Sequence, residues 1–460
     1  MLFRSYLDRL EKARPKSSRL HLFHSAGGMA SPQALRGLPL GLALSGPSAG
    51  VAAAGHCARD LGIELAISFD MGGTTTDVCL IRDGRAQVSS DRALAGRPLR
   101  QPMVAVDSIG AGGGSIACLD HGALRVGPES AGADPGPACY GRGGSAATVS
   151  DANLALGYLD ADRILGDGLA LNVKAARGAL EPLANAMDMS IEATALGVIR
   201  VANAAMVRAL RRITVERGID GRQCTLIAFG GAGPMHAAEV ARAFGITRIL
   251  VPVHSSAFSA LGCVSAELSY SQQQSLRMPL AQWQGDKLAT VRSALRQRLS
   301  DPLIAAGHDA DAIRIEEVAS VRYSGQSYAI EIFKPAFDDP QMLGQAFYDQ
   351  HTKLYGFATA EPWELIAIRQ RVSVPRSGPG TAPLPPGTGE QAPIKTTDCV
   401  FDLNGPLATP RFDRAALASG QTIQGPAVIE DAWSTVTVPP DATLGMDASG
   451  NLHLQLGADA

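Results

Sequence analysis

The hydrophobic and polar positions of the first quarter of the chain predict alternating helices and strands. A short amphipathic helix is expected at residues 6–11, where two leucines lie three positions apart. The apolar segment 20–23 predicts a strand, and the small residues of 48–61 predict a helix that packs closely. Residues 64–81 indicate a hairpin, because an apolar run and a β-branched run flank a Gly-Gly turn.

Helical and strand patterns alternate again in the middle of the chain. Apolar residues at helical spacing predict helices at about 174–188 and 191–218. A strand at 225–229 then leads through a cluster of glycines into a helix at 237–244 and a further strand at 247–252. This order of strand, glycine turn, helix and strand is typical of a doubly wound α/β domain.

The character of the sequence changes beyond about residue 275, where Gln272–Gln274 lead into an amphipathic helix. A chain of 460 residues also exceeds what one hydrophobic core usually serves. We therefore expect one α/β domain at 1–270 and a smaller, α+β or β-rich domain at 275–460. An exposed linker rich in Pro, Gly and Thr is expected at about 377–389.

Composition limits the possible partners of the protein. Apolar residues make up 46% of the chain and charged residues 18%, which fits a globular α/β protein. A net charge of −3 provides no electrostatic basis for binding nucleic acid or an anionic membrane, so neither partner is expected. No apolar run approaches the roughly 20 residues of a membrane span, and the start lacks the apolar core of a signal peptide. The seven scattered cysteines form no Cys-x-x-Cys pair and indicate reduced thiols in a cytoplasmic protein.

The turn of the predicted hairpin carries residues suited to binding phosphate. Gly72 and Gly73 would let backbone N–H groups point at an anion without a Cβ in the way. Thr74, Thr75 and Thr76 add hydroxyl donors. The turn is therefore a candidate phosphate clamp.

Two carboxylates, Asp70 and Asp77, flank this turn. A carboxylate beside a triphosphate would repel it, so Asp70 is expected to act through Mg²⁺, by way of a water, or to order a water. The alternative is a plain β-hairpin with an exposed turn, and the motif alone leaves it open.

A second glycine cluster consists of Gly230, Gly231, Ala232 and Gly233, directly after an apolar strand and before a helix. Such a loop can approach a nucleotide closely and offer helix N-terminal amides. Taken alone, it is equally compatible with a tight strand-to-helix connection.

The two clusters together resemble the hydantoinase A/oxoprolinase family, which includes ATP-dependent N-methylhydantoinases, 5-oxoprolinases and acetone and acetophenone carboxylase subunits. The matching segments occur in family order and are Leu44–Gly50, Asp70–Asp77, Asp107–Ser115, Asp134–Gly141, Thr148–Ala152 and Phe229–His236. The resemblance implies an actin-like ATPase (ribonuclease H-like) lobe as the nucleotide-binding domain at 1–270, followed by the family's C-terminal domain.

The resemblance also implies roles for the motif residues. Asp70 and Asp77 would manage Mg²⁺ and the γ-phosphate as catalytic residues. Thr74 and Thr75 would contact phosphate oxygens, and Gly231–Gly233 would lie on the adenosine side. Family enzymes are thought to phosphorylate a carbonyl or amide oxygen of the substrate. ATP and Mg²⁺ are the implied cofactors, and a hydantoinase B-type subunit is the implied partner in a hetero-oligomer.

The family's N-terminal lobe opens with its own glycine-rich phosphate loop, and no such loop precedes the region of resemblance. The chain is therefore expected to be a truncated reading frame, a split subunit or a degraded copy. ATP hydrolysis would then need the opposite side of the cleft from elsewhere.

Four further residues of the family segments could bind a second divalent metal or contact substrate, namely Asp107, Cys139, Asp151 and His236. Structural roles are the alternative. A His after a glycine loop commonly forms a hydrogen bond at a helix N-terminus, and a Cys between Ala and Tyr is commonly packed in a core.

Three functions stay open at this point. The first is a subunit of an ATP-dependent hydrolase that opens a cyclic amide of the hydantoin or 5-oxoproline type by phosphoryl activation. An ATP-dependent ketone carboxylase subunit would carry the same nucleotide motifs. The third is a non-catalytic lobe that binds a nucleotide or a partner.

Overall fold

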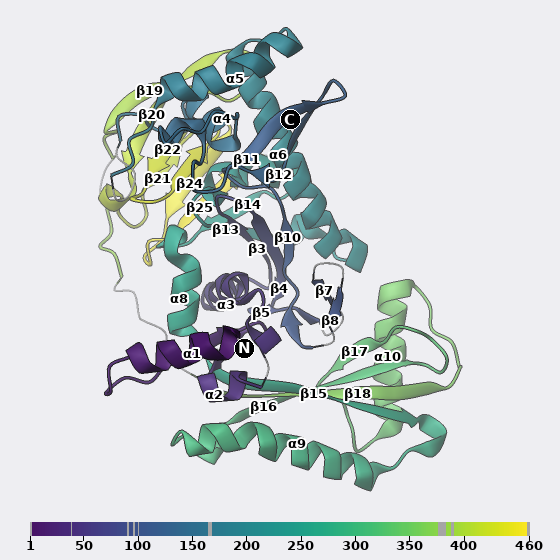
Figure 1. The fold of residues 1–460 in the computed structure, drawn as a ribbon. Coiled ribbons are helices and arrows are strands. Elements are labelled where there is room, and N and C mark those ends of the chain that lie inside the picture. The colour runs from purple at the N-terminus through teal and green to yellow at the C-terminus, as the bar shows by residue number, and fades with distance from the viewer. Residues whose placement is uncertain are drawn as a thin grey trace. The chain divides into compact units, whose positions relative to one another are not determined.

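The computed structural model in Figure 1 describes residues 2–37, 39–89, 92–94, 97–99, 101–163, 168–375, 383–387 and 391–457. The chain divides into two compact units, and each is assembled from three separate segments. Unit 1 comprises Met1–Ala53, Gln87–Ala105 and Leu261–Pro379, and unit 2 comprises Ala54–Ala86, Val106–Ala260 and Gly380–Ala460. These units differ from the contiguous domains expected at 1–270 and 275–460, because strands from distant segments pair with one another.

Unit 2 is built on a nine-stranded mixed sheet. Its strand order is β10-β4-β3-β13-β14-β25-β24-β21, and β5 pairs with β4. These strands are β3 (Leu65–Met71), β4 (Thr76–Arg82), β5 (Arg85–Ala86), β10 (Asp107–Ile109), β13 (Thr225–Phe229), β14 (Arg248–Val251), β21 (Thr422–Gln424), β24 (Ala442–Met446) and β25 (Leu452–Leu456). Strands β3, β13 and β14 are parallel. Strand β25 pairs antiparallel with β14, so the last described strand joins the sheet of the glycine motifs.

Helices α6 and α7 pack on one face of this sheet. The helices within unit 2 are α4 (Val149–Ala155), α5 (Val173–Met187), α6 (Ile191–Ile213) and α7 (Gly233–Phe244). Alternate residues of β3, namely Ile67, Phe69 and Met71, are fully buried in the same core cluster as residues of α6 and α7. By strand alternation, the side chains of Ser68 and Asp70 face the other side of the sheet.

Among the described helices, α6 alone is long and apolar enough to cross a membrane by length and composition. However, 61% of its apolar window is buried inside the structure. Ala202, Met206 and Leu210 lie at helical spacing and are fully buried. Its apolar character is therefore that of a core helix.

Two smaller sheets complete unit 2. They consist of β11 (Ser115–Asp120) with β12 (Ala123–Ser130), and of β19 (Lys395–Val400), β20 (Pro406–Asp413), β22 (Ala427–Glu430) and β23 (Thr435–Val438). Buried Arg411 anchors the four-stranded sheet, because it pairs with Glu430 at 2.8 Å and donates to the carbonyl oxygens of Gly157 and Tyr158 at 2.9 Å each.

Most of the predicted linker at 377–389 lies outside the described residues. Its described part, 383–387, is bound to unit 2 through its backbone. The N–H of Leu384 donates to the carbonyl oxygen of Ala448 at 2.7 Å. This part is therefore held against unit 2 by hydrogen bonds of its backbone.

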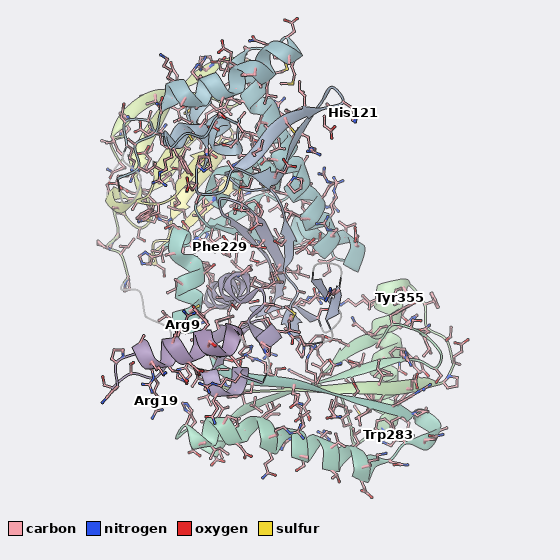
Figure 2. All side chains as sticks on the ribbon, viewed as in Figure 1. Arg9, Arg19, His121, Phe229, Trp283 and Tyr355 are labelled. Carbon is pink, nitrogen blue, oxygen red and sulfur yellow. The ribbon has the colours of Figure 1, made fainter. Side chains whose placement is uncertain are left out.

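Unit 1 contains a six-stranded sheet of order β1-β2-β15-β18-β16-β17. Its strands are β1 (Leu22–His24), β2 (Gly28–Ala30), β15 (Leu268–Pro279), β16 (Arg314–Tyr323), β17 (Ile330–Phe333) and β18 (Trp363–Val374). Helix α9 (Gly285–Ala305) runs along one face of this sheet (Figure 1). Trp283, labelled in Figure 2, meets the buried ring of Trp363 edge-on at a centroid distance of 5.8 Å.

The remaining elements of unit 1 are short, apart from two helices. They are α1 (Leu2–Ala13), α2 (Pro32–Leu35), α10 (Pro340–Tyr355), β6 (Val88–Ser89), β7 (Arg92–Leu94), β8 (Arg97–Leu99) and β9 (Met103–Val104). Two of the unit boundaries fall inside helices, namely α3 (Ser45–Asp60) and α8 (Phe258–Ser265).

The predicted elements near 6–11, 48–61, 64–81 and 225–252 are confirmed. Gln272–Gln274 do not adjoin a helix. They lie inside β15, because their backbones pair with the long strand β18. Cross-strand pairing overrides the weak local preference of glutamine.

Candidate functional site

The β3–β4 hairpin places Asp70 and Asp77 directly opposite each other. The register pairs Asp70 with Asp77 and Met71 with Thr76, and directly opposed residues project from the same face of a sheet. Burial, together with the charge of Asp77, raises the pKa of Asp70 to about 6. The two carboxylates therefore form a pair in which each opposes the ionisation of the other.

Asp77 is the more buried member of the pair. Burial raises its pKa, while hydrogen bonds from Ser108 and Thr75 lower it. Its Oδ1 atom is buried and accepts no hydrogen bond from the described residues. A buried carboxylate oxygen without a donor is unfavourable unless a cation or another donor reaches it. The donor set thus fits a hard divalent cation such as Mg²⁺.

The turn between the two aspartates is open. A Cβ built on Gly72 or Gly73 would meet no other atom within 4 Å, and Gly73 and Thr74 are exposed. Thr76 behaves differently, because its buried hydroxyl donates to the carbonyl oxygen of Ala111 at 2.5 Å. The turn therefore offers free space above its backbone, while Thr76 anchors its base.

A third glycine segment, Gly112–Gly114, is hydrogen-bonded to the backbone of this turn. The N–H groups of Gly113 and Gly114 donate to the carbonyl oxygens of Gly72 and Gly73 at 3.0 and 2.6 Å. A Cβ on Gly112 would lie 2.5 Å from the backbone nitrogen of Thr74. Sequence reasoning assigned this segment to a family motif but not to the site. Its glycine density was the available signal.

The loop after β13 lies against Asp70. Strand β13 pairs in parallel with β3 and sets Phe229 beside Asp70. Gly230 has a φ of +82°, and a Cβ there would lie 2.4 Å from Oδ1 of Asp70. The N–H of Ala232 donates to the carbonyl oxygen of Met71 at 3.0 Å. The structure thus brings together the two glycine clusters that are distant in sequence.

The other two residues of this loop differ in exposure. Gly231 is exposed, whereas Gly233 is buried in the first turn of α7. A Cβ on Gly233 would lie 3.3 Å from the carbonyl oxygen of Phe69. Gly231 is thus accessible to a ligand, and Gly233 permits close packing of α7 on β3.

Ser259 and Ser108 contact the aspartates and were missed by sequence reasoning. The hydroxyl of Ser259 donates to Oδ2 of Asp70 at 3.2 Å. Ser108 pairs with Asp77 across β10 and β4. Nothing in the sequence near Ser259 distinguishes it from other serines, because its role depends on where helix α8 begins.

Asp107 lies on β10, next to the strand of Asp77. It forms an ion pair of 2.7 Å with Arg212 of α6. Its charge is one cause of the raised pKa of Asp77. Asp107 is therefore a neighbour of the carboxylate pair and is held by a guanidinium.

Asp151 and Cys139 are brought together by a helix cap. One carboxylate oxygen of Asp151 accepts the N–H of Cys139 at 2.7 Å. The other accepts the N–H and the hydroxyl of Thr148 at 2.9 and 2.7 Å, which completes a capping box at α4. Burial and the charge of Asp151 raise the pKa of the Cys139 thiol. These contacts are structural.

His236 is buried near the start of α7 between two asparagines. Its Nδ1 lies 2.8 Å from Oδ1 of Asn203, and its Nε2 lies 3.1 Å from Nδ2 of Asn153. Burial lowers its pKa to about 4. Within the described ranges, no three His, Cys, Asp or Glu side chains are grouped so that they could hold a metal ion. A second metal at these residues stays a prediction without support from the contacts.

Comparisons with known proteins agree with these motifs. A family model described as hydantoinase/oxoprolinase matches residues 1–272. Caprolactamase subunit alpha of Pseudomonas jessenii is 35% identical over 95% of this chain and 64% of its own length. 5-Oxoprolinase 1 of Arabidopsis thaliana is 33% identical over 90% of this chain and 34% of its own length.

Two solved structures are similar over nearly the whole chain. The crystal structure of the ATP-dependent caprolactamase from Pseudomonas jessenii has a TM-score of 0.87 and 32% identity, covering 99% of this chain and 68% of the other. A nucleotide-free acetone carboxylase structure has a TM-score of 0.78 and 27% identity, covering 98% of this chain and 67% of the other. The chain therefore has their mixed α/β fold, although it spans only 64% of the caprolactamase alpha subunit. The chain belongs to the hydantoinase/oxoprolinase family.

Proposed function

We propose that unit 2 binds ATP at the β3–β4 hairpin, and that the chain is part of an ATP-dependent hydrolase that opens a cyclic amide. The main support is the opposed pair Asp70 and Asp77 beside an open Gly-Gly turn, with the Gly230–Gly233 loop packed against it. An actin-like arrangement of the nucleotide lobe is part of this proposal.

In this proposal the backbone of Gly72 and Gly73 and the hydroxyls of Thr74 and Thr75 receive the phosphates. The exposed Gly231 lies on the adenosine side. Asp70 and Asp77 hold Mg²⁺, which would neutralise phosphate charge and orient the γ-phosphoryl group when bound. The raised pKa of Asp70 shows that its ionised form is unfavourable without a nearby positive charge, which a bound cation would supply.

The proposed chemistry transfers the γ-phosphoryl group to the amide oxygen of the substrate. ADP leaves, and the O-phosphorylated amide carbon becomes a better electrophile for water, whose addition breaks the C–N bond; a second water then releases the phosphate. Two waters are consumed in total, since one amide C–N bond and one phosphoanhydride bond are hydrolysed. The aspartate pair contributes electrostatic positioning of the phosphoryl group.

The comparisons favour an amide hydrolase over a ketone carboxylase. Similarity is greater to the caprolactamase, with a TM-score of 0.87 against 0.78 for acetone carboxylase. The first of these relatives is named as a subunit, and we propose a hydantoinase B-type partner in a hetero-oligomer for this chain as well. A cytoplasmic location belongs to the same proposal.

Calorimetric titration of the purified chain with Mg²⁺ and ATP tests nucleotide binding. The D70N variant is expected to weaken binding at least tenfold, because the charge that holds the cation is removed. The control is D120N, which alters an exposed aspartate of β11 in the same unit. Wild-type chain that binds no nucleotide, or equal binding by D70N, would contradict the proposal.

ADP release then separates the three functions. The chain is mixed with a B-type subunit and with hydantoin, 5-oxoproline or caprolactam, and separately with acetone and bicarbonate. Stimulation by a cyclic amide supports the hydrolase, and stimulation by acetone with bicarbonate supports the carboxylase. Nucleotide binding without any turnover supports a non-catalytic lobe.

A further inference from the structure

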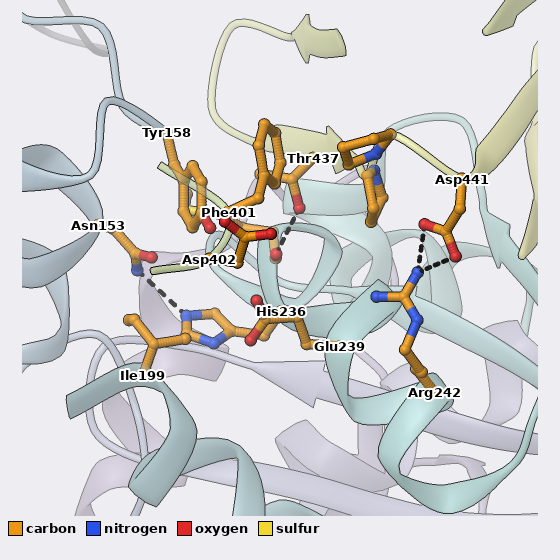
Figure 3. Close-up of a pocket in the computed structure, with 13 residues that line it drawn as sticks. Asn153, Tyr158, Ile199, His236, Glu239, Arg242, Phe401, Asp402, Thr437 and Asp441 are labelled. Atoms are coloured by element: carbon orange, nitrogen blue, oxygen red, sulfur yellow. Dashed lines mark hydrogen bonds and ion pairs between the residues drawn. The ribbon is translucent and has the colours of Figure 1, made fainter. Parts of the chain in front are cut away.

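Unit 2 contains a cavity of about 310 Å³ that takes no part in the proposed nucleotide site. It is lined by α6 and α7 residues, by α4 and by loops of the C-terminal strands (Figure 3). The side chains of Asp70 and Asp77 project from the opposite face of the sheet from these two helices. Its volume lies at the lower end of the range for small-molecule sites, about 300–1,000 Å³.

A chain of buried hydrogen bonds ends at this cavity. Nδ2 of Asn203 donates to Glu239 at 2.8 Å, and its Oδ1 accepts from Nδ1 of His236 at 2.8 Å. Burial raises the pKa of Glu239, while the charges of Arg200 and Arg242 and the hydrogen bond from Asn203 act in the opposite direction. Because the amide nitrogen of Asn203 donates to Glu239, its oxygen is the atom that faces His236, so Nδ1 of His236 is the donor.

The last group of this chain is Asn153. A neutral His236 that donates through Nδ1 must accept through Nε2, so the contacting atom of Asn153 is the amide nitrogen, at 3.1 Å. Oδ1 of Asn153 is consequently left as a buried acceptor, and the described part of the chain provides no donor for it. Asn153 is one of the residues that line the cavity (Figure 3).

An acceptor without a partner is costly when it is buried. Asn153 is only 2% exposed, and an unsatisfied buried acceptor costs about 1–3 kcal/mol. A ligand N–H group in the cavity would remove that cost. The unpartnered oxygen of Asn153 therefore favours a ligand that carries a hydrogen-bond donor.

The charged side chains of the lining favour a positively charged ligand. Three carboxylates, Glu239, Asp402 and Asp441, face a single guanidinium, Arg242. Arg242 is already paired with Asp441 at 2.7 Å. Asp402 therefore leaves the lining with a further negative charge, while the charge of Glu239 is offset by Arg200.

Aromatic and apolar side chains form the rest of the wall. The rings of Tyr158 and Phe401 lie 5.4 Å apart between centroids. The hydroxyl of Tyr158 donates to the carbonyl oxygen of Val400 at 2.9 Å, so its proton is already bound within the protein. Aromatic faces next to carboxylates suit an organic cation.

We propose that this cavity binds a small organic ammonium ion with a compact apolar body. One N–H of the ligand donates to Oδ1 of Asn153, and Asp402 balances the charge. The apolar body lies against Tyr158 and Phe401. This inference does not depend on nucleotide binding by the hairpin.

Cyclohexylammonium chloride is the probe, with cyclohexanol as a neutral analogue of the same shape. Binding to the purified chain is measured by saturation-transfer difference NMR and calorimetry, with and without saturating ATP. We expect the cation to bind at least tenfold more tightly than the alcohol and ATP to leave this binding unchanged. Equal binding of both probes, or displacement of the cation by ATP or adenosine, overturns the proposal.

Variants locate the probe. N153L and D402N are each expected to weaken binding of the cation at least tenfold, because one removes the acceptor and the other removes the charge. N185L and D120N, at exposed positions of α5 and β11, are the matched controls. If N153L fails to fold, D402N and F401L still test the site, because Asp402 and Phe401 are only half-buried. Unchanged affinity in both of these folded variants contradicts the site.

Discussion

Gly230 lies so close to Asp70 that a Cβ on the glycine would be 2.4 Å from Oδ1 of the carboxylate and 2.5 Å from the carbonyl oxygen of Met71. No side chain can be accommodated there without moving either the aspartate or strand β3. The loop at Gly230 is thus packed directly against the carboxylate of Asp70.

The first prediction concerns G230A. The variant must relieve a contact of 2.4 Å and adopt a φ of +82°, which we expect to lower the free energy of unfolding by about 2–4 kcal/mol. ATP binding weakens as well, because Asp70 is displaced. Hydrogen exchange of the amides in β3 and β13 measures the stability of this unit.

The control for this variant is G218A. Gly218 has a φ of +70° but meets no atom within 4 Å, so it reports backbone strain alone, about 1 kcal/mol. If both variants lose the same stability, the contact with Asp70 does not matter.

The second prediction concerns the open turn. G73A is expected to change stability by less than about 0.5 kcal/mol, because the new methyl group meets nothing within 4 Å. It should nevertheless weaken ATP binding at least tenfold, since the methyl group occupies the proposed phosphate space. Urea unfolding and calorimetric titration measure the two effects separately.

G112A is the counterpart of G73A. Its methyl group would lie 2.5 Å from the nitrogen of Thr74, so it should reduce stability and ATP binding together. Normal ATP binding by G73A would rule out the turn as the phosphate cradle.

The third prediction is a pH dependence of stability in the ligand-free chain. The pKa of Asp70 is raised by burial and by Asp77 from 3.8 to about 6, so the folded chain binds this proton more tightly than the unfolded chain. Below about pH 4 this carboxyl is protonated in both states and does not destabilise the fold. As the pH rises from about 4 to about 6, the unfolded chain loses the proton first, so the free energy of unfolding falls.

The D70N variant should therefore be more stable than wild type at pH 8, by on the order of 2 kcal/mol, and should lose this advantage near pH 4. Urea unfolding at a series of pH values in the absence of Mg²⁺ gives the measurement. D120N should show no such gain, because Asp120 is half exposed. A D70N variant that is less stable at pH 8 would show that the carboxylate pair is not strained.

The fourth prediction separates a cap from a metal ligand at Asp151. D151A removes hydrogen bonds from Cys139 and Thr148 and should lower the free energy of unfolding by about 2–4 kcal/mol. Added Zn²⁺ or Mn²⁺ should make no difference to wild type or variant, as measured by thermal unfolding. A metal-dependent stabilisation of wild type that is lost in D151A would instead make Asp151 a ligand.

Local pattern was sufficient for the elements that carry the nucleotide motifs. An apolar run at 65–69, a Gly-Gly turn and a β-branched run determine the hairpin, since each preference agrees with the others. The helix after Gly233 and the strand at 248–251 follow from the same kind of agreement.

Local pattern could not reveal the polar partners of the site. Ser259 and Asp70 are 189 positions apart, and Asn203 and His236 are 33 apart. Such pairs depend on how helices dock on the sheet, which side-chain packing across the whole unit decides. The same holds for the unpartnered oxygen of Asn153, which is defined by what the surrounding elements do not supply.

The sequence by itself determined the family, the glycine turn at Asp70–Asp77 and the order of strands and helices around it, because these depend on short-range spacing and residue chemistry. Only the tertiary structure decided that the last described strand joins the sheet of the glycine motifs, that Gly230 abuts Asp70, and that a cavity lies beside α7. The physical reason is that long-range strand pairing and close packing are set by the complementarity of surfaces that are distant in the chain.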